Sequence, residues 1–289
     1  MRTPRSARWI SLAVALVCAC RAGEPVSQTD ELRVISLSPS TTDVVVALGG
    51  REALVGVDQY SKVLSGLGEL PSLGGLFAPD LERALELRPT LVLGVRSESQ
   101  AAFFAQLRAR GVRVREIDSS GSLEQVLETY PQIGKELGRE PDARALVARV
   151  REQLAEVSRS VEGLERPSVA LVVEREPLYV AAGGSFASAL IELAGGRNVF
   201  GDLSGAYPQV SLELLAERAP DVLIDSTREP TTGPQAQSEA HGYWSRYGFV
   251  RRVEIVAPGV ATLPGTRLAE GAQILRARVH PGRTWSQAP

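Results

Sequence analysis

Cysteine is scarce in this chain of 289 residues, and both cysteines, Cys18 and Cys20, lie near its start. Beyond residue 20, disulfides, thiol catalysis and cysteine metal sites are therefore excluded together. Histidine is equally rare, with only His241 and His280. A bare metal ion would need a set of His, Asp and Glu ligands, so we expect neither a metal site nor a cofactor.

Long apolar runs and an excess of one charge are also missing. No apolar stretch reaches the roughly 18 residues that a membrane-spanning helix needs. The formal net charge is −2, which gives no basic surface for nucleic acid. With 44% hydrophobic and 23% charged residues, the composition is that of a globular protein, and the length leaves room for two lobes.

The start of the chain has the pattern of a secretory signal. Three arginines precede a short apolar stretch at residues 9–17, and Cys20 follows the small residue Ala19. A basic segment, an apolar core and a small residue before the cleavage site are typical of such a signal. The cysteine makes it look like a bacterial lipoprotein signal, in which Cys20 is acylated and becomes the mature N-terminus. Ordinary cleavage near Ala19 or Ala22, without a lipid, is the alternative.

Two segments of the chain align with each other without a gap. Residues 80–93 and 211–224 share Leu, Glu, Glu and Pro at matching positions, and both end in an apolar triplet. Each copy predicts a capped helix, a proline that ends it, and a buried strand. Each also places a glutamate, Glu82 or Glu213, in the first helical turn. A unit repeated at half the chain length predicts two similar lobes with a cleft between them.

Predicted strands and helices alternate along the chain, which favours parallel sheets with helices on both faces. Residues 141–164 show the longest helical pattern, and at about 1.5 Å per residue such a helix suits a strut between two lobes. The polar residues 228–240 are predicted to form a loop. Outside the repeat, strands are expected at residues 33–37, 54–57, 112–117, 169–173 and 253–256, and helices at residues 99–110, 123–137, 185–193 and 268–279.

Five motifs, none of them specific alone, occur in this order at residues 34–43, 81–93, 194–200, 207–213 and 263–267. Together they resemble the periplasmic binding proteins of ABC importers for cobalamin, ferric siderophores and haem. The cobalamin-binding member is the most similar, chiefly through the run Tyr-Pro-Gln-Val-Ser that begins the fourth motif. The resemblance implies an α/β fold with two Rossmann-like lobes and parallel sheets. A single long rigid helix would join the lobes, and the ligand would lie in the cleft between them.

The implied function is that of an extracytoplasmic binding lipoprotein. It would capture a cobalamin-like corrinoid or an iron chelate and deliver it to an ABC permease dimer and its ATPase. We expect a monomer, held at the membrane only through its lipid, with no cofactor of its own. The expected parts are a signal peptide at residues 1–19, a flexible tether at 20–31, an N-terminal lobe at 32–139, an inter-lobe helix at 140–165, a C-terminal lobe at 166–280 and a tail at 281–289.

Ligand residues are expected in the loops at strand ends that face the other lobe. Aromatic side chains suit the plane of a corrin or porphyrin, and Arg267 suits an anionic group. Leu76 and Val95 stand where the cobalamin-binding member carries tryptophan. The candidates for the cleft are Ser38, Ser40, Tyr60, Leu76, Phe77, Val95, Arg96, Tyr179, Tyr207 and Arg267, whereas Phe103, Phe104, Phe186 and Phe200 are expected in the core.

The resemblance also gives the two repeated glutamates a role. Matching glutamates of the family lie on the rims of the two lobes and pair with arginines of the permease. Glu82 and Glu213 are therefore expected to dock onto the permease, where charge-assisted pairs set the register. The alternative is that each glutamate only favours the positive end of its own helix, an effect of about 0.3–1 kcal/mol.

Three other functions are considered. A haem-binding receptor of the same family would use His241 or a tyrosine as iron ligand, although His241 also fits a surface position. A ligand-sensing lipoprotein would use the same fold without transport. A hydrolase would need the motif Gly-x-Ser-x-Gly, but Ala187 stands two residues after Ser185, where the second glycine is required. We therefore expect a binding protein with no catalytic residue.

Overall fold

The computed structural model describes residues 31–64, 66–75, 78–119, 121–227, 234–259 and 263–282. Cys20, the expected signal peptide and nearly all of the expected tether lie outside the described residues, and so do Leu76 and Phe77. Leu32–Pro289 form one compact unit, to which the following description is limited.

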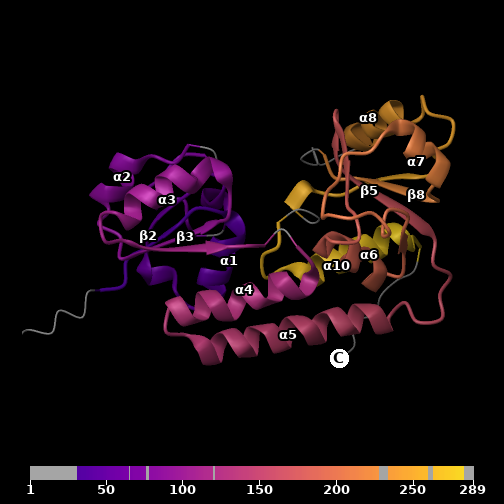
Figure 1. The fold of residues 1–289 in the computed structure, drawn as a ribbon. Coiled ribbons are helices and arrows are strands. Elements are labelled where there is room, and N and C mark those ends of the chain that lie inside the picture. Colours follow the sequence, from indigo (N-terminus) through magenta and orange to yellow (C-terminus); the bar gives the residue numbers. More distant parts are fainter. Residues whose placement is uncertain are drawn as a thin grey trace, which may run out of the picture. The chain divides into compact units, whose positions relative to one another are not determined.

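The first lobe is built on a sheet of four parallel strands in the order β2-β1-β3-β4. Figure 1 shows α2 and α3 beside the strands β2 and β3 of this lobe. The central strands β1 and β3 are almost entirely buried, as expected for a parallel sheet whose two faces are covered by helices. The predicted strands and their parallel arrangement are confirmed here. The elements are β1 Val34–Ser36, α1 Pro39–Ala47, β2 Leu54–Val57, α2 Leu81–Glu86, β3 Leu91–Val95, α3 Ala101–Arg108 and β4 Arg113–Ile117.

The second lobe has a sheet in the order β6-β5-β8-β9, with the short β7 also paired to β5. β5, β7, β8 and β9 are parallel, and β6 is antiparallel to β5. The sequence pattern does not predict β6 or β7, because strands this short have no periodicity of their own. The elements are β5 Ser168–Arg175, β6 Leu178–Val180, α6 Phe186–Leu193, β7 Arg197–Asn198, α7 Leu212–Arg218, β8 Val222–Asp225, α8 Pro234–Trp244, β9 Val253–Ile255 and α10 Leu268–Val279.

Helix α8 corrects the predicted loop over residues 228–240, whose second half is helical. Ala240 and Trp244 are one helical turn apart and both are buried in the core beside β9. The indole N–H of Trp244 donates to the Asp225 carboxylate at 2.7 Å, at the end of β8. The polar composition of the segment was therefore misleading, because packing of its C-terminal turn outweighs its weak helical pattern.

A pair of helices, α4 Leu123–Glu136 and α5 Glu140–Arg159, lies side by side at the junction of the lobes (Figure 1). α4 contacts both α1 of the first lobe and α6 of the second, and α5 contacts α6 and α10. The 20 residues of α5 span about 30 Å. The helix ends before the predicted residue 164, and Gly163 takes a φ of 74° in the turn that follows. A single connecting helix is thus not confirmed, because two helices share the junction.

One hydrophobic core runs through both sheets and the helix pair. Val45 and Leu93 belong to it from the first lobe, Tyr130 and Leu146 from α4 and α5, and Ile191 from the second lobe. Interiors of this kind are close-packed and resist compression. The shared core therefore favours small opening motions over wide closure.

The sequence repeat is also a structural repeat. Asp80 and Ser211 cap α2 and α7, each accepting a backbone N–H from the first helical turn. Arg88 and Ala219 occupy aligned positions before a proline, and both are left-handed, with φ of 46° and 40°. These are the two non-glycine residues with positive φ among the described residues. The repeated unit therefore keeps its cap, its strained turn and its strand in both lobes.

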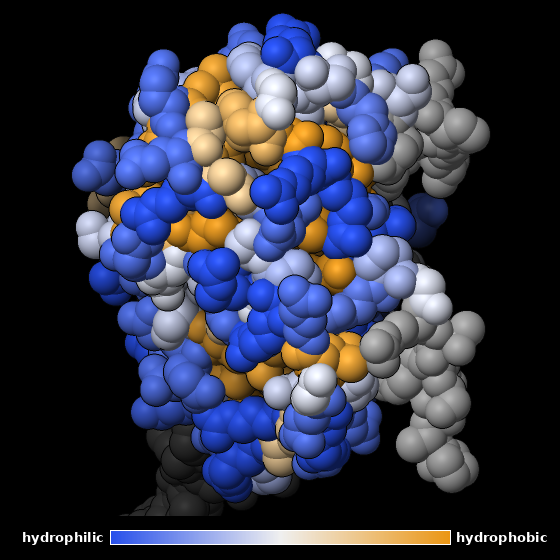
Figure 2. All heavy atoms as spheres, turned by 90° about the vertical axis from the view of Figure 1, so that its right-hand side faces the viewer, coloured by the Kyte–Doolittle hydropathy of each residue, from blue (hydrophilic) through white to orange (hydrophobic). Residues whose placement is uncertain are grey.

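In the described residues, no helix combines the length and apolar character that crossing a membrane would require. On the face drawn in Figure 2, apolar residues gather in several patches that are separated by hydrophilic side chains. This face therefore shows no single continuous apolar surface.

Candidate ligand cleft

A cavity of about 410 Å³ lies between the lobes. In the first lobe its wall comes from the residues that follow β1, β2, β3 and β4, at the carboxyl edge of the parallel sheet, where ligands of such sheets bind. In the second lobe it comes from the start of α6 and from the segments before α7 and α10. The lining residues are Leu37, Ser38, Pro39, Ser40, Asp58, Tyr60, Val95, Arg96, Ile117, Asp118, Ser119, Phe186, Tyr207, Leu263 and Pro264.

The structure brings six of the ten predicted cleft residues to this cavity: Ser38, Ser40, Tyr60, Val95, Arg96 and Tyr207. Tyr179 does not line it; this residue lies in β6 and pairs with Gln209. Arg267 lines a smaller neighbouring cavity. No ligand contact is tested by this placement, and the role of each residue stays a prediction.

Two large apolar side chains in the described residues are markedly exposed, Tyr60 at 52% and Leu263 at 45%. Both line the cavity, Tyr60 from the first lobe and Leu263 from the second. Exposed apolar groups gathered in one concave place indicate a binding site. Leu263 was missed as a ligand candidate, although an apolar Leu-Pro pair just before a helix was a signal in the sequence.

Phe186 lies in the core, as predicted, but its place beside the cavity was not expected. The structure shows that it is both buried, at 1% exposure, and part of the cavity lining. The residues at the carboxyl end of β4, Ile117 to Ser119, were missed as well. The rule that ligands meet the carboxyl ends of parallel strands would have found them.

A chain of buried hydroxyl groups holds the wall at the start of α1. Ser38 caps α1 by accepting the backbone N–H of Thr41 at 3.2 Å. The hydroxyls of Ser38 and Ser40 lie 3.1 Å apart. The chain continues through Thr41, Ser36, Thr42 and Ser61, with oxygen separations of 2.8–3.0 Å. Because every hydroxyl has a partner, Ser38 and Ser40 are held in fixed orientations.

Asp58 lies at the inner end of this chain and is 2% exposed. Its carboxylate accepts the backbone N–H groups of Tyr60 at 2.8 Å and Ser61 at 3.1 Å, and also the Ser61 hydroxyl. Burial raises the pKa of Asp58 above its ordinary value, although these hydrogen bonds act in the opposite direction. This acidic group, with the exposed Arg96 on the same wall, gives an apolar cleft a few polar groups that can orient a ligand.

Tyr207 supplies the aromatic surface of the second lobe. Burial raises the pKa of its hydroxyl, so the phenol stays neutral near pH 7. A neutral phenol can pack against a ligand ring and donate a hydrogen bond, but it is a poor anionic ligand for iron.

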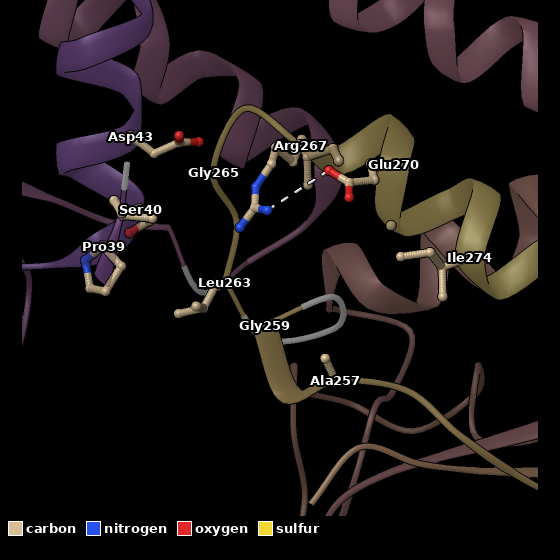
Figure 3. Close-up of a pocket in the computed structure, with 13 residues that line it drawn as sticks. Pro39, Ser40, Asp43, Ala257, Gly259, Leu263, Gly265, Arg267, Glu270 and Ile274 are labelled. Atoms are coloured by element: carbon tan, nitrogen blue, oxygen red, sulfur yellow. Dashed lines mark ion pairs between the residues drawn. The ribbon is translucent and has the colours of Figure 1, made fainter. Parts of the chain in front are cut away.

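A second cavity, of about 250 Å³, adjoins the first and shares Pro39, Ser40 and Leu263 with it (Figure 3). Arg267 lines this cavity, and its guanidinium lies 3.9 Å from the Glu270 carboxylate. Both side chains of that pair are more than half exposed, so the pairing contributes little. The guanidinium therefore has spare donors for an anionic group.

A family profile for periplasmic binding proteins matches residues 34–246. A vitamin B12-binding protein of Vibrio parahaemolyticus is 30% identical over 206 residues, which cover 71% of this chain and 72% of the relative. The chain belongs to the periplasmic binding protein family.

Two further relatives of this periplasmic binding protein extend the comparison. YvrC of Bacillus subtilis, an uncharacterised ABC transporter substrate-binding lipoprotein, is 25% identical, with 96% of this chain and 98% of the relative covered. The crystal structure of a periplasmic heme-binding protein from Pseudomonas aeruginosa is similar with a TM-score of 0.74 at 27% identity, covering 87% of this chain and 94% of that one. All three relatives are named for substrate binding, so the expectation of an extracytoplasmic binding protein and not an enzyme is confirmed.

The serine that could suggest a nucleophile has a structural role. The Ser185 hydroxyl donates to the Ala182 carbonyl oxygen at 2.8 Å and accepts the Ser188 backbone N–H at 3.1 Å, so it caps α6. His241 is exposed in the last turn of α8 and does not line the cavity. In the part of the chain that the structure describes, no three His, Cys, Asp or Glu residues gather as a metal site.

Glu82 and Glu213 are both exposed in the first turns of α2 and α7. Neither forms an ion pair with another described residue. Hydrogen bonds from its own backbone N–H and from the Ser211 hydroxyl lower the pKa of Glu213, which keeps this carboxylate charged. Both glutamates are therefore available to a partner, as the docking hypothesis requires.

Proposed function

We propose that this periplasmic binding protein captures a cobalamin-like corrinoid or an iron chelate and delivers it to an ABC importer. The supporting observation is that Tyr60 and Leu263, the two markedly exposed large apolar residues among those described, line one cavity, one from each lobe. Each of these surfaces can pack against an apolar part of a ligand, and each contact hides apolar area from water.

Haem is the alternative ligand, favoured by one observation. Tyr60 is exposed and lines the cavity, and an accessible tyrosine oxygen can bind ferric iron. The relatives support both ligands, since one is named for vitamin B12 and another for heme. The two alternatives use the same side chain differently, the ring for a corrinoid and the oxygen for haem.

Delivery would use a permease dimer and its ATPase. The exposed carboxylates of Glu82 and Glu213, one on each lobe, fit two arginine sites on such a dimer. Acylation at Cys20 would hold the protein at the membrane, and a single lipid chain binds a membrane only reversibly, so several chains are needed for a stable anchor.

Binding of cyanocobalamin, haemin and a panel of ferric siderophores tests the proposal directly. The full chain with Cys18→Ser and Cys20→Ser would be titrated with each compound by calorimetry. We expect one compound to bind with a Kd of about 1 µM or tighter. Absence of saturable binding by every compound would contradict the proposed function.

Two substitutions at one position separate the alternatives. Tyr60→Phe keeps the ring and removes the oxygen, whereas Tyr60→Ala removes both. For a corrinoid, Phe should keep most of the affinity and Ala should lose it. For haem, the Tyr60→Phe variant should lose affinity and the iron–phenolate absorption band as completely as the Tyr60→Ala variant does.

A further inference from the structure

The loop before α10 is held by side chains from distant parts of the chain. Thr266 donates from its backbone N–H at 2.6 Å and from its hydroxyl at 2.7 Å to one carboxylate oxygen of Asp43, on α1. The Tyr130 hydroxyl, on α4, donates to the Gly265 carbonyl oxygen at 2.8 Å. Asp43 and Thr266 are 223 residues apart in sequence, so these bonds tie the second lobe to the first.

The lack of space at Gly265 shows that the loop lies close to Asp43 of α1. A Cβ atom built at Gly265 would lie 2.5 Å from the second-lobe-facing oxygen of Asp43, Oδ2, inside any normal contact distance. Glycine is therefore required for this contact. Figure 3 shows the Asp43 carboxylate turned toward the loop at Gly265.

The hydrogen bonds of this contact include a strong type. Hydrogen bonds to a carboxylate are stronger than neutral ones, and Asp43 accepts two from the same residue. Burial, and secondly the charge of Asp43, raise the pKa of Tyr130. Its hydroxyl therefore remains a donor near neutral pH.

The same helix and the same loop both line the ligand cavity. α1 begins at Pro39, next to the lining residues Ser38 and Ser40, and the loop carries Leu263 and Pro264. Asp43 lies one turn further along α1, and Thr266 lies two residues beyond Pro264. A contact so near both walls fixes their separation.

We propose that Asp43 is a positioning residue of the cleft, whose bonds to Thr266 latch the Leu263 wall onto α1 and must break when the ligand leaves. This inference rests on the proposed function, in which the cleft holds the ligand. The latch acts beside the shared core, which joins the lobes on the side of α4 and α5. The core holds the lobes together on one side and the latch adds a tie beside the cavity, so we expect the lobes to open further when the latch is lost.

Distance measurement between the lobes tests the latch without a ligand. The full chain with Cys18→Ser and Cys20→Ser has no native thiol, so Ala105→Cys on α3 and Glu217→Cys on α7, both at exposed positions, can carry spin labels. Asp43→Ala should broaden the distance distribution. Asp43→Asn should restore most of the narrow distribution, because its amide oxygen can accept the same two bonds.

Ligand release supplies the second readout. With cyanocobalamin or haemin as probe, Asp43→Ala should release the bound molecule about tenfold faster, the change expected for loss of a charge-assisted bond. Asp43→Asn should stay within about twofold of the parent. If neither probe binds the parent, the proposed function fails, while the distance distribution still decides the latch.

A merely structural role would give a different result. Asp43→Ala and Asp43→Asn would then lower the melting temperature alike and leave both the distances and the release rate unchanged, which would overturn the proposal. Should Asp43→Ala fail to fold, Thr266→Val against Thr266→Ser repeats the comparison from the other side, because only serine keeps the donating hydroxyl. Equal distances and equal release for that pair would overturn the latch as well.

Discussion

At the scale of single residues, the contribution of one side chain to ligand affinity can be tested most directly at Tyr60. Its side chain is exposed in the cavity, so truncation removes ligand contact without emptying the core. Tyr60→Ala should weaken binding of the compound identified by titration about tenfold or more, because an aromatic contact is worth roughly 0.5–1.5 kcal/mol beyond the area it buries. Calorimetry of the variant measures the change.

Tyr179 provides the matched control. It is the same residue type, is partly buried in β6, and does not line the cavity. Tyr179→Ala should leave the Kd of the compound within about twofold of the parent. The opposite pattern, with affinity lost at Tyr179 and kept at Tyr60, would show that the cleft has been placed wrongly.

Asp221 should make the free energy of unfolding depend on pH. Its carboxylate accepts the Ser168 backbone N–H at 2.9 Å and the Ser168 hydroxyl at 2.6 Å. These hydrogen bonds lower the pKa of Asp221 below its ordinary 3.8. A group with a lowered pKa stabilises the folded state above the unfolded pKa, and this contribution is lost as the pH falls through the folded pKa.

Ser168→Ala should therefore reduce the free energy of unfolding more at pH 7 than at pH 3. The hydroxyl favours the charged carboxylate, and at pH 3 part of that advantage has gone. Urea unfolding of parent and variant at both pH values measures the difference. An equal loss at the two values would mean that the Ser168 hydroxyl acts only by packing.

At the scale of elements, the repeated turn after α2 and α7 stores backbone strain. Ala219 is left-handed, with φ of 40°, where a side chain costs about 1–2 kcal/mol and glycine costs little. Ala219→Gly should raise the free energy of unfolding by about 0.5–1 kcal/mol. Ala216→Gly, within α7 itself, should lower it by a similar amount. If both changes lowered stability alike, the turn would not be strained.

The helices and strands also show which elements the spacing of apolar residues can predict. The strands of the first lobe and α10 could be predicted because each is buried along a regular face, and burial leaves a pattern in the sequence. α8 could not be predicted in this way, since its anchor is the contact of Trp244 with Asp225, a residue on another strand. The pairing of α5 with α4 was missed for the same reason. The spacing of apolar residues shows that a helix has a buried face, but not which element packs against that face.

At the scale of the whole molecule, docking should depend on both lobes together. Glu82→Lys or Glu213→Lys should weaken ligand-stimulated ATP hydrolysis by the importer, reconstituted in vesicles, by about tenfold or more while the Kd of the ligand stays unchanged. Charge repulsion at a permease arginine is the reason. Glu86→Lys on α2 and Glu217→Lys on α7 are matched controls, since both are exposed glutamates on the same helices. Loss of ligand affinity in the docking variants would contradict the assignment.

The sequence by itself determined the two-lobed plan of this protein, the parallel sheets, and the repeat that gives each lobe a glutamate at a helix start. These features follow from local patterns of apolar residues, caps and prolines, which act within a few residues. Only the tertiary structure decided which candidates share a cavity, adding Leu263 and Phe186 and leaving Tyr179 outside it. It alone brought Asp43 to Thr266, because such a contact depends on how the loops of two lobes approach each other, and no local pattern records that distance.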